Sequence, residues 1–449
     1  MLFSYPSEVD YSLFSSSSPA YAKYGLPFNV KFCRSCLVSN QRPSSTIEFK
    51  NDGKSPKTII NIDSDNICDA CKAKDLKRQI DWNYRESLLR DLCDKYRSSD
   101  GSYDCLVPGS GGKDSFYQAH LLKYKYGMNP LTCTWAPNIY TDWGRKNHQS
   151  WIHAGFDNIL FTPNGRVHRL ITRLAVENLF HPFQPFILGQ KNLAPKIAAK
   201  YNIKLVFYGE NEAEYGNPLA DMSSSMRNFL YFSTSSEDDI YLGGSSLSEL
   251  RELGLKPNDW HSYLPIDPAI LSEKQIEVHY LGFYERWHPQ GAFYYASKHG
   301  NFMSSPERTI GTYSRYNSID DKIDDFHYHT TWIKFGIGRA TYDASQEIRS
   351  GDITREEGLA LVRKYDGEFP SRWAEEIFSY LSLDKESFPY AYSHFECPVF
   401  DLSYYNRLAD NFRSPHLWYW NGSSFHLRYT SFADYDSSPD SSLGWEGNS

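Results

Sequence analysis

One stretch decides how the chain folds: Val107-Pro108-Gly109-Ser110-Gly111-Gly112-Lys113-Asp114-Ser115. The apolar run 103–107 before it predicts a buried strand, and 116–126 after it has apolar side chains at helical spacing. Glycines let a backbone approach an anion closely, and the first turn of a helix offers free N–H groups and a positive dipole end. The stretch therefore predicts a phosphate-binding loop between a strand and a helix, with Lys113 as its charge.

The loop differs from the Walker pattern, in which Ser or Thr directly follows Gly-Lys. Here Asp114 follows Lys113, and Ser-Gly-Gly-Lys-Asp-Ser resembles the loop of the ATP pyrophosphatase (PP-loop) superfamily. The resemblance implies that the loop holds ATP, and that AMP is transferred to a substrate oxygen before a nucleophile displaces it. The alternative is an ordinary surface turn. The implied ATP-binding residues of the loop are Ser110, Gly111, Gly112, Lys113, Asp114 and Ser115.

Length and composition limit the kinds of protein that this chain can be. The length of 449 residues predicts two or three domains, and the net charge of −8 argues mildly against a nucleic-acid partner. No apolar run approaches the roughly 18 residues of a membrane span, and the first residues lack the pattern of a signal peptide. We therefore expect a cytoplasmic chain without a membrane partner, whose eight cysteines are mostly reduced.

Two Cys-x-x-Cys pairs lie before the loop: Cys33 with Cys36, and Cys68 with Cys71. Each pair can place two sulfurs on one tetrahedral ion, so the four cysteines predict a structural zinc site. A redox pair, an iron–sulfur cluster and chance are the alternatives. The insert 46–62 contains two runs, 46–49 and 58–62, that resemble strands of a small ribbon.

Strands and helices alternate from 103 to 208, which predicts an α/β domain with a doubly wound parallel sheet. The polar segment 138–147 follows the second strand as an expected loop near the nucleotide, because ligands of such sheets lie beyond the carboxyl ends of the strands. The further strands are expected at 130–136, 158–162 and 205–208. The helices are expected at 81–96, 166–179 and 191–201.

Acids and amides follow the strand 205–208: Glu210, Asn211, Glu214 and Asn217. Their oxygens predict a site for Mg²⁺ with pyrophosphate, or for the substrate, with a solvated acidic turn as the alternative. Farther along, acids recur at roughly helical spacing over 320–325. Basic residues gather after them, including Lys334 and Arg339, and predict a surface for an anionic substrate.

These patterns divide the chain into five parts. We expect a lead-in over 1–30, a zinc ribbon over 31–80, an ATP-binding PP-loop domain over 81–222, a mainly helical substrate or partner region over 223–402, and a variable, partly disordered tail over 403–449.

Taken together, the motifs resemble those of the N-acetyl sugar amidotransferases of bacterial surface-polysaccharide biosynthesis, which serve lipopolysaccharide O-antigen or legionaminic-type nonulosonic acids. The resemblance runs from about 33 to about 370 and does not reach beyond about 385. It depends on the cysteine pairs, the loop, and three further groups of residues. These groups are Trp135-Ala136-Pro137 with Ile139-Tyr140-Thr141, Gly209-Glu210-Asn211 with Glu214-Tyr215-Gly216-Asn217, and Lys334-Phe335-Gly336 with Gly338-Arg339-Ala340-Thr341.

The resemblance implies a reaction in which the acetamido oxygen of a sugar is adenylated by ATP and ammonia then displaces AMP to leave an acetamidino group. Lys113 and the loop N–H groups would hold the β- and γ-phosphates, and Trp135 would bind ATP. Asp114 and Glu210 would help to hold Mg²⁺. The chain shows no glutaminase signature, so the resemblance implies a separate ammonia-channelling glutaminase as partner.

Two other functions remain open at this stage. A tRNA thiolase also combines a PP-loop with cysteine pairs and would use Cys105 or Cys133, although the acidic charge argues against it. A non-catalytic zinc-ribbon scaffold with a degenerate loop is the other, although the loop is intact.

Overall fold

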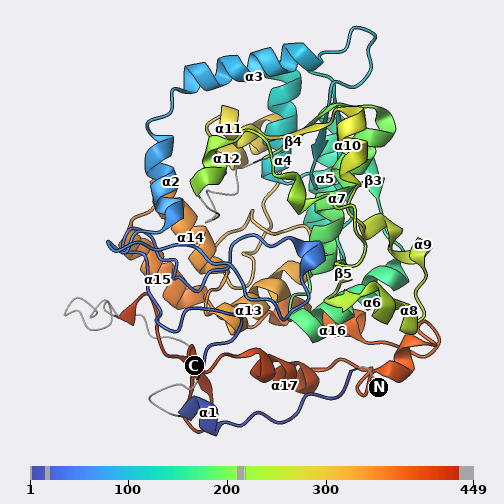
Figure 1. Ribbon diagram of the computed structural model, residues 1–449. Helices are drawn as coiled ribbons and strands as arrows, with labels where there is room; N and C mark the ends of the chain where they lie inside the picture. The colour runs from blue at the N-terminus through green and yellow to red at the C-terminus, as the bar shows by residue number, and fades with distance from the viewer. Residues whose placement is uncertain (1–2, 16–20, 210–216, 218, 434–449) are drawn as a thin grey trace.

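The core of the protein is a five-stranded sheet with the order β3-β2-β1-β4-β7; its strands β3 and β4 lie in the upper half of Figure 1. The structure is a computed structural model that describes residues 3–15, 21–209, 217 and 219–433. Every neighbouring pair of strands in this sheet is parallel. The strands are β1 (Cys105–Pro108), β2 (Pro130–Trp135), β3 (Asp157–Phe161), β4 (Leu205–Tyr208) and β7 (Glu277–Tyr280).

The chain changes direction across the sheet at β1. From β1 it runs to β2 and β3 on one side, and it then returns to β4 and β7 on the other. In an open α/β sheet the crevice beyond such a switch point is where ligands bind. The loop that begins at Gly109 leaves β1 at this crevice, so the topology places the predicted phosphate loop where a ligand is expected.

Helices cover both faces of the sheet, as the alternating strand pattern predicted. Leu106 packs with side chains of α6 (Gly165–Leu179) and α7 (Gln184–Tyr201) on one face. Its neighbours Cys105 and Val107 pack on the other face. The helices of that second face include α3 (Trp82–Tyr96), α4 (Lys113–His120), α5 (Asp142–His153) and α12 (Pro289–Gly300). The doubly wound α/β architecture is therefore confirmed.

The sequence analysis missed the fifth strand. It placed the whole sheet between 103 and 208, whereas β7 lies in the region that was expected to be mainly helical. β7 pairs with β4 from Leu205↔Glu277 to Tyr208↔Tyr280. The run Glu-Val-His-Tyr is short and has only one aliphatic side chain, so it gave no strand signal. Its pairing with β4, not its own composition, makes it a strand.

Three local predictions were wrong. The segment 46–49 is no strand: Phe49 packs in the sheet core, and Gln184 donates a hydrogen bond to the Glu48 carbonyl at 3.0 Å. Only isolated bridges, such as Pro43↔Ile59, stand in place of the ribbon. The expected loop 138–147 becomes α5 from Asp142, because Thr141 accepts a hydrogen bond from the Gly144 N–H. The helix expected from 191 begins at Gln184.

The C-terminal part is built mainly from helices, as expected, and both described ends of the chain pack onto it. Phe14 and Leu26, in the expected lead-in, are buried with Leu417 and Trp418. No helix in the part of the chain that the structure describes is long and apolar enough to cross a membrane. The remaining elements are α1 (Ser12–Ser15), α2 (Asp69–Lys77), β5 (Tyr241–Leu242), β6 (Ser245–Ser246), α8 (Leu247–Glu252), α9 (Pro257–Trp260), α10 (Pro268–Lys274), α11 (Leu281–Tyr284), α13 (Ile323–Phe335), α14 (Arg339–Ser350), α15 (Arg355–Tyr365), α16 (Ala374–Leu381), α17 (Leu402–Phe412), β8 (Trp418–Trp420) and β9 (Phe425–Leu427).

Candidate active site

The loop after β1 is shaped by two glycines. Gly111 has a φ of +84°, and a Cβ there would lie 2.7 Å from the Cα of His148. A Cβ on Gly109 would lie 2.1 Å from that of Ser115. Neither position has room for a side chain, so the loop backbone is held tightly against α4 and α5. Gly112 is the N-cap of α4, which directs the free N–H groups of the first turn toward the crevice.

Lys113 and Asp114 form the charged part of the loop. The Lys113 side chain is almost buried, and its Nζ donates to Asp114 Oδ1 at 2.6 Å and Oδ2 at 2.8 Å. The Ser115 hydroxyl donates to the Gly112 carbonyl at 3.1 Å. The ammonium group is therefore fixed at the helix N-terminus, beside a carboxylate that can also accept a cation.

A hollow of about 300 Å³ lies over the loop, and we call it the loop lobe. Ser110, Lys113 and Asp114 line one side of it, and Asp320 and Asp324 line the opposite side. Burial raises the pKa of Asp320, and a hydrogen bond from Ser110 partly offsets this rise. The loop lobe thus combines cationic and N–H donors for phosphates with oxygens that suit a hard divalent cation.

Asp324 is the least satisfied carboxylate of the loop lobe. It lies in the first turn of α13 and is 7% exposed, and its carboxylate forms no hydrogen bond or ion pair with another described residue. Burial raises its pKa well above the usual value, with further contributions from the nearby carboxylates of Asp320 and Asp321. Asp321 itself is structural, because it accepts hydrogen bonds from the backbone N–H groups of Asn138 and Ile139.

A second hollow of about 410 Å³ adjoins the loop lobe, and we call it the outer lobe. The outer lobe adds residues of α13, α14 and the segment after the first cysteine pair, among them Arg42, Thr331 and Tyr342. The two lobes therefore adjoin each other and share a wall that includes part of the phosphate loop. The residues that line both are Lys113, Asp114, Asn317, Tyr328 and Arg339.

Arg339 lies at the junction of the two lobes. Its Nε is 3.0 Å from Asp343 Oδ1, one helical turn away, and its guanidinium lies 4.3 Å from the ring centroid of Tyr328. Burial lowers the pKa of Arg339, but Asp343 and its other neighbours raise it overall. Arg339 is thus a fixed, fully charged group that a substrate anion in either lobe can reach.

Arg42 supplies a second guanidinium to the outer lobe. Arg42 is 8% exposed and lies 5.0 Å from the ring centroid of Tyr342, and its Nε has no hydrogen-bond partner. Burial lowers its pKa from the usual value. A buried donor without a partner is costly, so an anionic or carbonyl group of a ligand in the outer lobe would be stabilised there.

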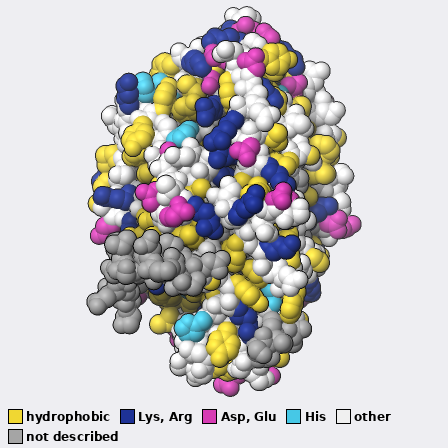
Figure 2. Space-filling view, turned by 90° about the vertical axis from the view of Figure 1, so that its left-hand side faces the viewer, with side chains coloured by type: hydrophobic (Ala, Val, Ile, Leu, Met, Phe, Trp, Pro, Cys, Tyr) yellow, Lys and Arg dark blue, Asp and Glu magenta, His cyan; other side chains and the backbone are white. Residues whose placement is uncertain are grey.

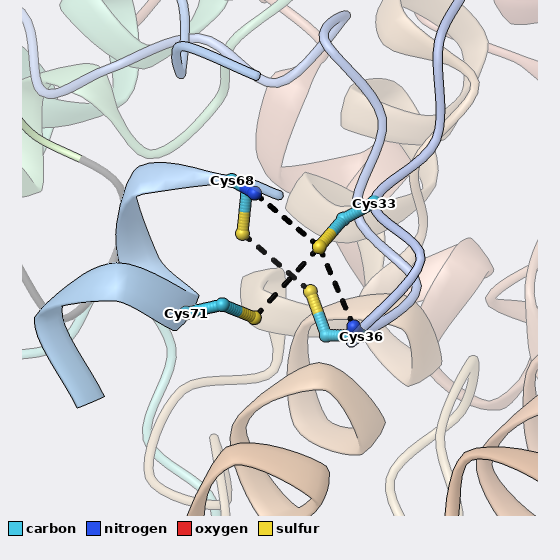
Figure 3. Close-up of side chains that lie close together, drawn as sticks. All are labelled: Cys33, Cys36, Cys68 and Cys71. Atoms are coloured by element: carbon cyan, nitrogen blue, oxygen red, sulfur yellow. Dashed lines mark hydrogen bonds between the residues drawn. The ribbon is translucent and has the colours of Figure 1, made fainter. Parts of the chain in front are cut away.

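The four cysteines meet at one point near the outer lobe (Figure 3). All four are buried; Cys33 Sγ lies 3.8 Å from Cys71 Sγ, and Cys36 Sγ lies 3.7 Å from Cys68 Sγ. A tetrahedral ion with Zn–S bonds of 2.3 Å needs sulfurs about 3.8 Å apart, so the cluster fits a structural zinc ion. The backbone N–H groups of Cys36 and Cys68 donate to Cys33 Sγ at 3.5 and 3.4 Å, respectively.

The cluster positions the wall of the outer lobe. Val38 and Arg42 follow the first cysteine pair and line this lobe, and Leu37 packs against α14 and α15. The N–H of Leu37 also donates to the hydroxyl of Ser345 at 3.3 Å. A metal ion held by the four cysteines would thus also stabilise the wall of the outer lobe.

The predicted site residues divide into three groups. Ser110, Gly112, Lys113, Asp114 and Arg339 line the cavity, and Gly111 and Ser115 shape the loop. Trp135, Asn217 and Lys334 are buried elsewhere and line neither lobe. Glu210, Asn211 and Glu214 lie outside the described residues.

The three buried residues have local partners. Trp135 packs 4.9 Å from Phe161 between ring centroids, in the core beneath the sheet. The side-chain Oδ1 of Asn217 accepts from the Ser45 N–H at 2.9 Å. Lys334 Nζ donates to the Leu179 carbonyl at 2.6 Å, at the end of α6.

The sequence analysis did not assign Arg42, Asn317 or Tyr328 to the site, and it saw the acids of 320–325 only as one helical face. That run of acids was the sequence feature that indicated this part of the site. Carboxylates that are buried at the start of a helix are unusual unless they have a partner such as a cation. Single polar residues such as Arg42 carry no signal of their own. They join the site only through the tertiary fold.

Cys105 and Cys133 are 0% and 1% exposed within the sheet. Burial raises the pKa of both thiols well above the usual value. A sulfur-transfer enzyme needs an accessible thiolate, so their positions count against the thiolase alternative.

Comparison with known proteins concerns mainly the C-terminal part. Residues 310–431 match the family described as LPS biosynthesis protein WbpG-like, C-terminal domain. This part is thus WbpG-like, and it supplies Asn317, Tyr328 and Arg339 to the cavity. The chain is also 33% identical over 84 residues to an uncharacterized protein of Methanocaldococcus jannaschii, a match that covers 19% of this chain and 30% of that protein.

Proposed function

We propose that the chain is an ATP-dependent amidotransferase of bacterial lipopolysaccharide biosynthesis, which converts the acetamido group of an N-acetyl sugar into an acetamidino group. One observation carries the proposal: residues of the phosphate loop and of the WbpG-like domain together line both lobes, and Lys113 and Asp114 border each of them. The family description connects the domain to lipopolysaccharide biosynthesis, and the loop supports ATP chemistry.

The loop lobe suits ATP. The N–H groups at the start of α4 and the Nζ of Lys113 would hold the β- and γ-phosphates. Asp114, with Asp320 or Asp324, offers carboxylate oxygens for Mg²⁺, which when bound neutralises phosphate charge. The aromatic walls formed by Phe183 and Phe186 suit the adenine ring.

The outer lobe suits the sugar. It is lined by hydroxyl, amide and guanidinium groups, which can hydrogen-bond a polar ring. A sugar there could direct its acetamido oxygen toward the loop lobe past Arg339 and Tyr328, because both residues border the two lobes.

The chemistry balances in two steps. The acetamido oxygen attacks the α-phosphorus, a P–O bond forms, and pyrophosphate leaves with the electrons of the broken bond. Ammonia then adds to the imidate carbon, loses a proton, and AMP leaves with the former amide oxygen. The residues named above act by positioning and charge stabilisation, which supply most of the acceleration in such phosphoryl transfers. A separate glutaminase would supply the ammonia.

The test is mass spectrometry of a panel of N-acetylated nucleotide sugars and nonulosonic acids, each incubated with the protein, Mg-ATP and ammonium salt. We expect one sugar to show replacement of oxygen by NH, with equal amounts of AMP and pyrophosphate. AMP without a change in any sugar would point to another acceptor. No consumption of ATP, even after addition of a candidate glutaminase, would overturn the proposal in favour of a scaffold.

A further inference from the structure

A small basic hollow of about 80 Å³ opens beside α2, and we call it the basic vestibule. Its cationic side chains come from three separate parts of the chain: Lys74 and Lys77 from α2, Arg286 from the segment after α11, and Arg349 from the end of α14. Lys and Arg side chains gather down the middle of the face on which α2 lies (Figure 2).

The vestibule is positive in an acidic protein. The chain has a net charge of −8, yet no carboxylate lies among the described residues that line the vestibule. Two further lining residues have acidic neighbours: Arg78 lies 3.7 Å from Asp75, and His288 lies 3.4 Å from Asp352. A hollow lined by charges of one sign concentrates ions of the opposite sign.

Helix capping explains only part of this arrangement. Lys74 and Lys77 lie in the last turn of α2, where cations stabilise the helix dipole, and Lys77 Nζ donates to the Trp287 carbonyl at 3.0 Å. Arg349 lies beside the cysteine cluster, whose thiols raise its pKa overall despite burial. The exposed Arg286, which comes from another element, has neither role. Arg286 thus points to a ligand most directly.

The vestibule adjoins the candidate active site. It shares Gln346 and Arg349 with the outer lobe, and the outer lobe shares Lys113 and Arg339 with the loop lobe. Cationic side chains therefore border each of the three neighbouring hollows. An anion that forms in the cavity, or that extends out of it, meets the vestibule next.

We propose that the basic vestibule binds a diphosphate group. Cations from α2 and from the segment of Arg286 face one hollow, so they can contact two neighbouring phosphates at once. Two sources have this chemistry: pyrophosphate released at the loop, and the diphosphate of a nucleotide-linked sugar whose sugar lies in the outer lobe. The choice between these sources rests on the proposed function, but the binding itself does not.

The experiment measures binding of inorganic pyrophosphate and of UDP by calorimetry, without ATP or turnover. The test variant is Lys74→Ala/Arg286→Ala, and the matched control is Lys200→Ala/Arg166→Ala, which removes the same charges from exposed sites on α7 and α6. Lys113→Ala reports on pyrophosphate bound at the loop. Metal content and Tm of each variant check that the fold is intact.

We expect pyrophosphate to bind Lys113→Ala, and the vestibule variant to weaken this binding at least about tenfold when combined with it, whereas the control changes it little. Binding that is lost entirely in Lys113→Ala, or that is equally weakened in the control, would overturn the proposal. Tighter binding of UDP than of pyrophosphate would assign the site to a nucleotide-linked sugar, and the reverse to the released product. Either result stands even if no sugar is amidated.

Discussion

The two lobes of the cavity are built in opposite ways. The loop lobe takes its phosphate-binding wall from one unbroken stretch, 109–115, whereas the outer lobe combines Arg42 with residues of α13 and α14 about three hundred positions later in the chain. A contiguous loop needs only local glycines and a helix start, so it can be identified in a sequence. An assembled wall depends on how distant elements pack, and it is suited to recognition of a particular substrate.

We expect the largest loss of activity from a substitution in the contiguous loop 109–115. We expect Lys113→Ala to reduce formation of AMP by at least about 100-fold, because a preorganised charge on the phosphates is lost. The fold should persist, since the Lys113 Nζ hydrogen-bonds only to its neighbour Asp114 among the described residues and has one distant ring contact, with Tyr316 at 6.0 Å. Release of AMP and pyrophosphate measures the effect, with Lys200→Ala as the control. Near-normal turnover would remove the loop from the mechanism.

The cysteine cluster tests whether the outer lobe depends on the metal. We expect Cys36→Ser to abolish metal binding and to lower the free energy of unfolding by on the order of 4 kcal/mol, as loss of a structural metal typically does. Cys93→Ser is the matched control, because Cys93 is equally buried but lies outside the cluster. Metal analysis and chemical denaturation provide the measurements. A Cys36→Ser protein that retains its metal and stability would contradict the zinc assignment.

The same contrast explains what the sequence could predict. The strands β1, β2 and β4 have apolar runs and lead into polar loops, so the sheet and its loop follow from local pattern. β7 has no such run and becomes a strand only by pairing with β4. The segment 46–49 has a strand-like pattern, but it forms no strand, because Phe49 packs into the core of the main sheet. Long-range packing decides both cases.

The site shows the same limit. Lys113 and Arg339 both emerged from sequence motifs and both line the cavity. Lys334 belongs to a motif of the same family resemblance, yet it is buried against the end of α6. A motif identifies residues that a fold needs, but it does not distinguish a ligand contact from a packing contact. Arg42 shows the converse, since no motif marks it although it lines the outer lobe.

Arg42 therefore provides a sharper test of the assembled lobe. We expect Arg42→Gln to raise the KM for the sugar about tenfold, because one charge-assisted contact is lost, with little change in the KM for ATP. Steady-state kinetics with each substrate varied in turn measures the two constants. Arg34→Gln, an exposed arginine of the same cysteine segment, is the control. An equal rise in both KM values would show that Arg42 supports the whole cavity instead of the sugar.

Lys334 should give the smallest functional effect and a distinct pH signature. Burial lowers its pKa to about 7, with Lys57 adding to the shift and Glu48 opposing it. The unfolded chain keeps this proton up to its usual pKa, so unfolding takes up a proton between pH 7 and about 10. Stability contributed by Lys334 therefore rises with pH across that window, by at most about 1.4 kcal/mol per pH unit.

Lys334→Met should remove this slope and leave the KM values for ATP and sugar unchanged, because the side chain borders neither lobe. Urea denaturation at several pH values between 7 and 10 measures the slope, and Lys200→Met should retain it. Loss of the hydrogen bond to Leu179 lowers the free energy of unfolding by about 1 kcal/mol at all pH values. This constant loss can be told apart from the change in pH dependence, because it does not vary with pH. A raised KM for the sugar would return Lys334 to the binding site and would weaken the division between contiguous and assembled walls.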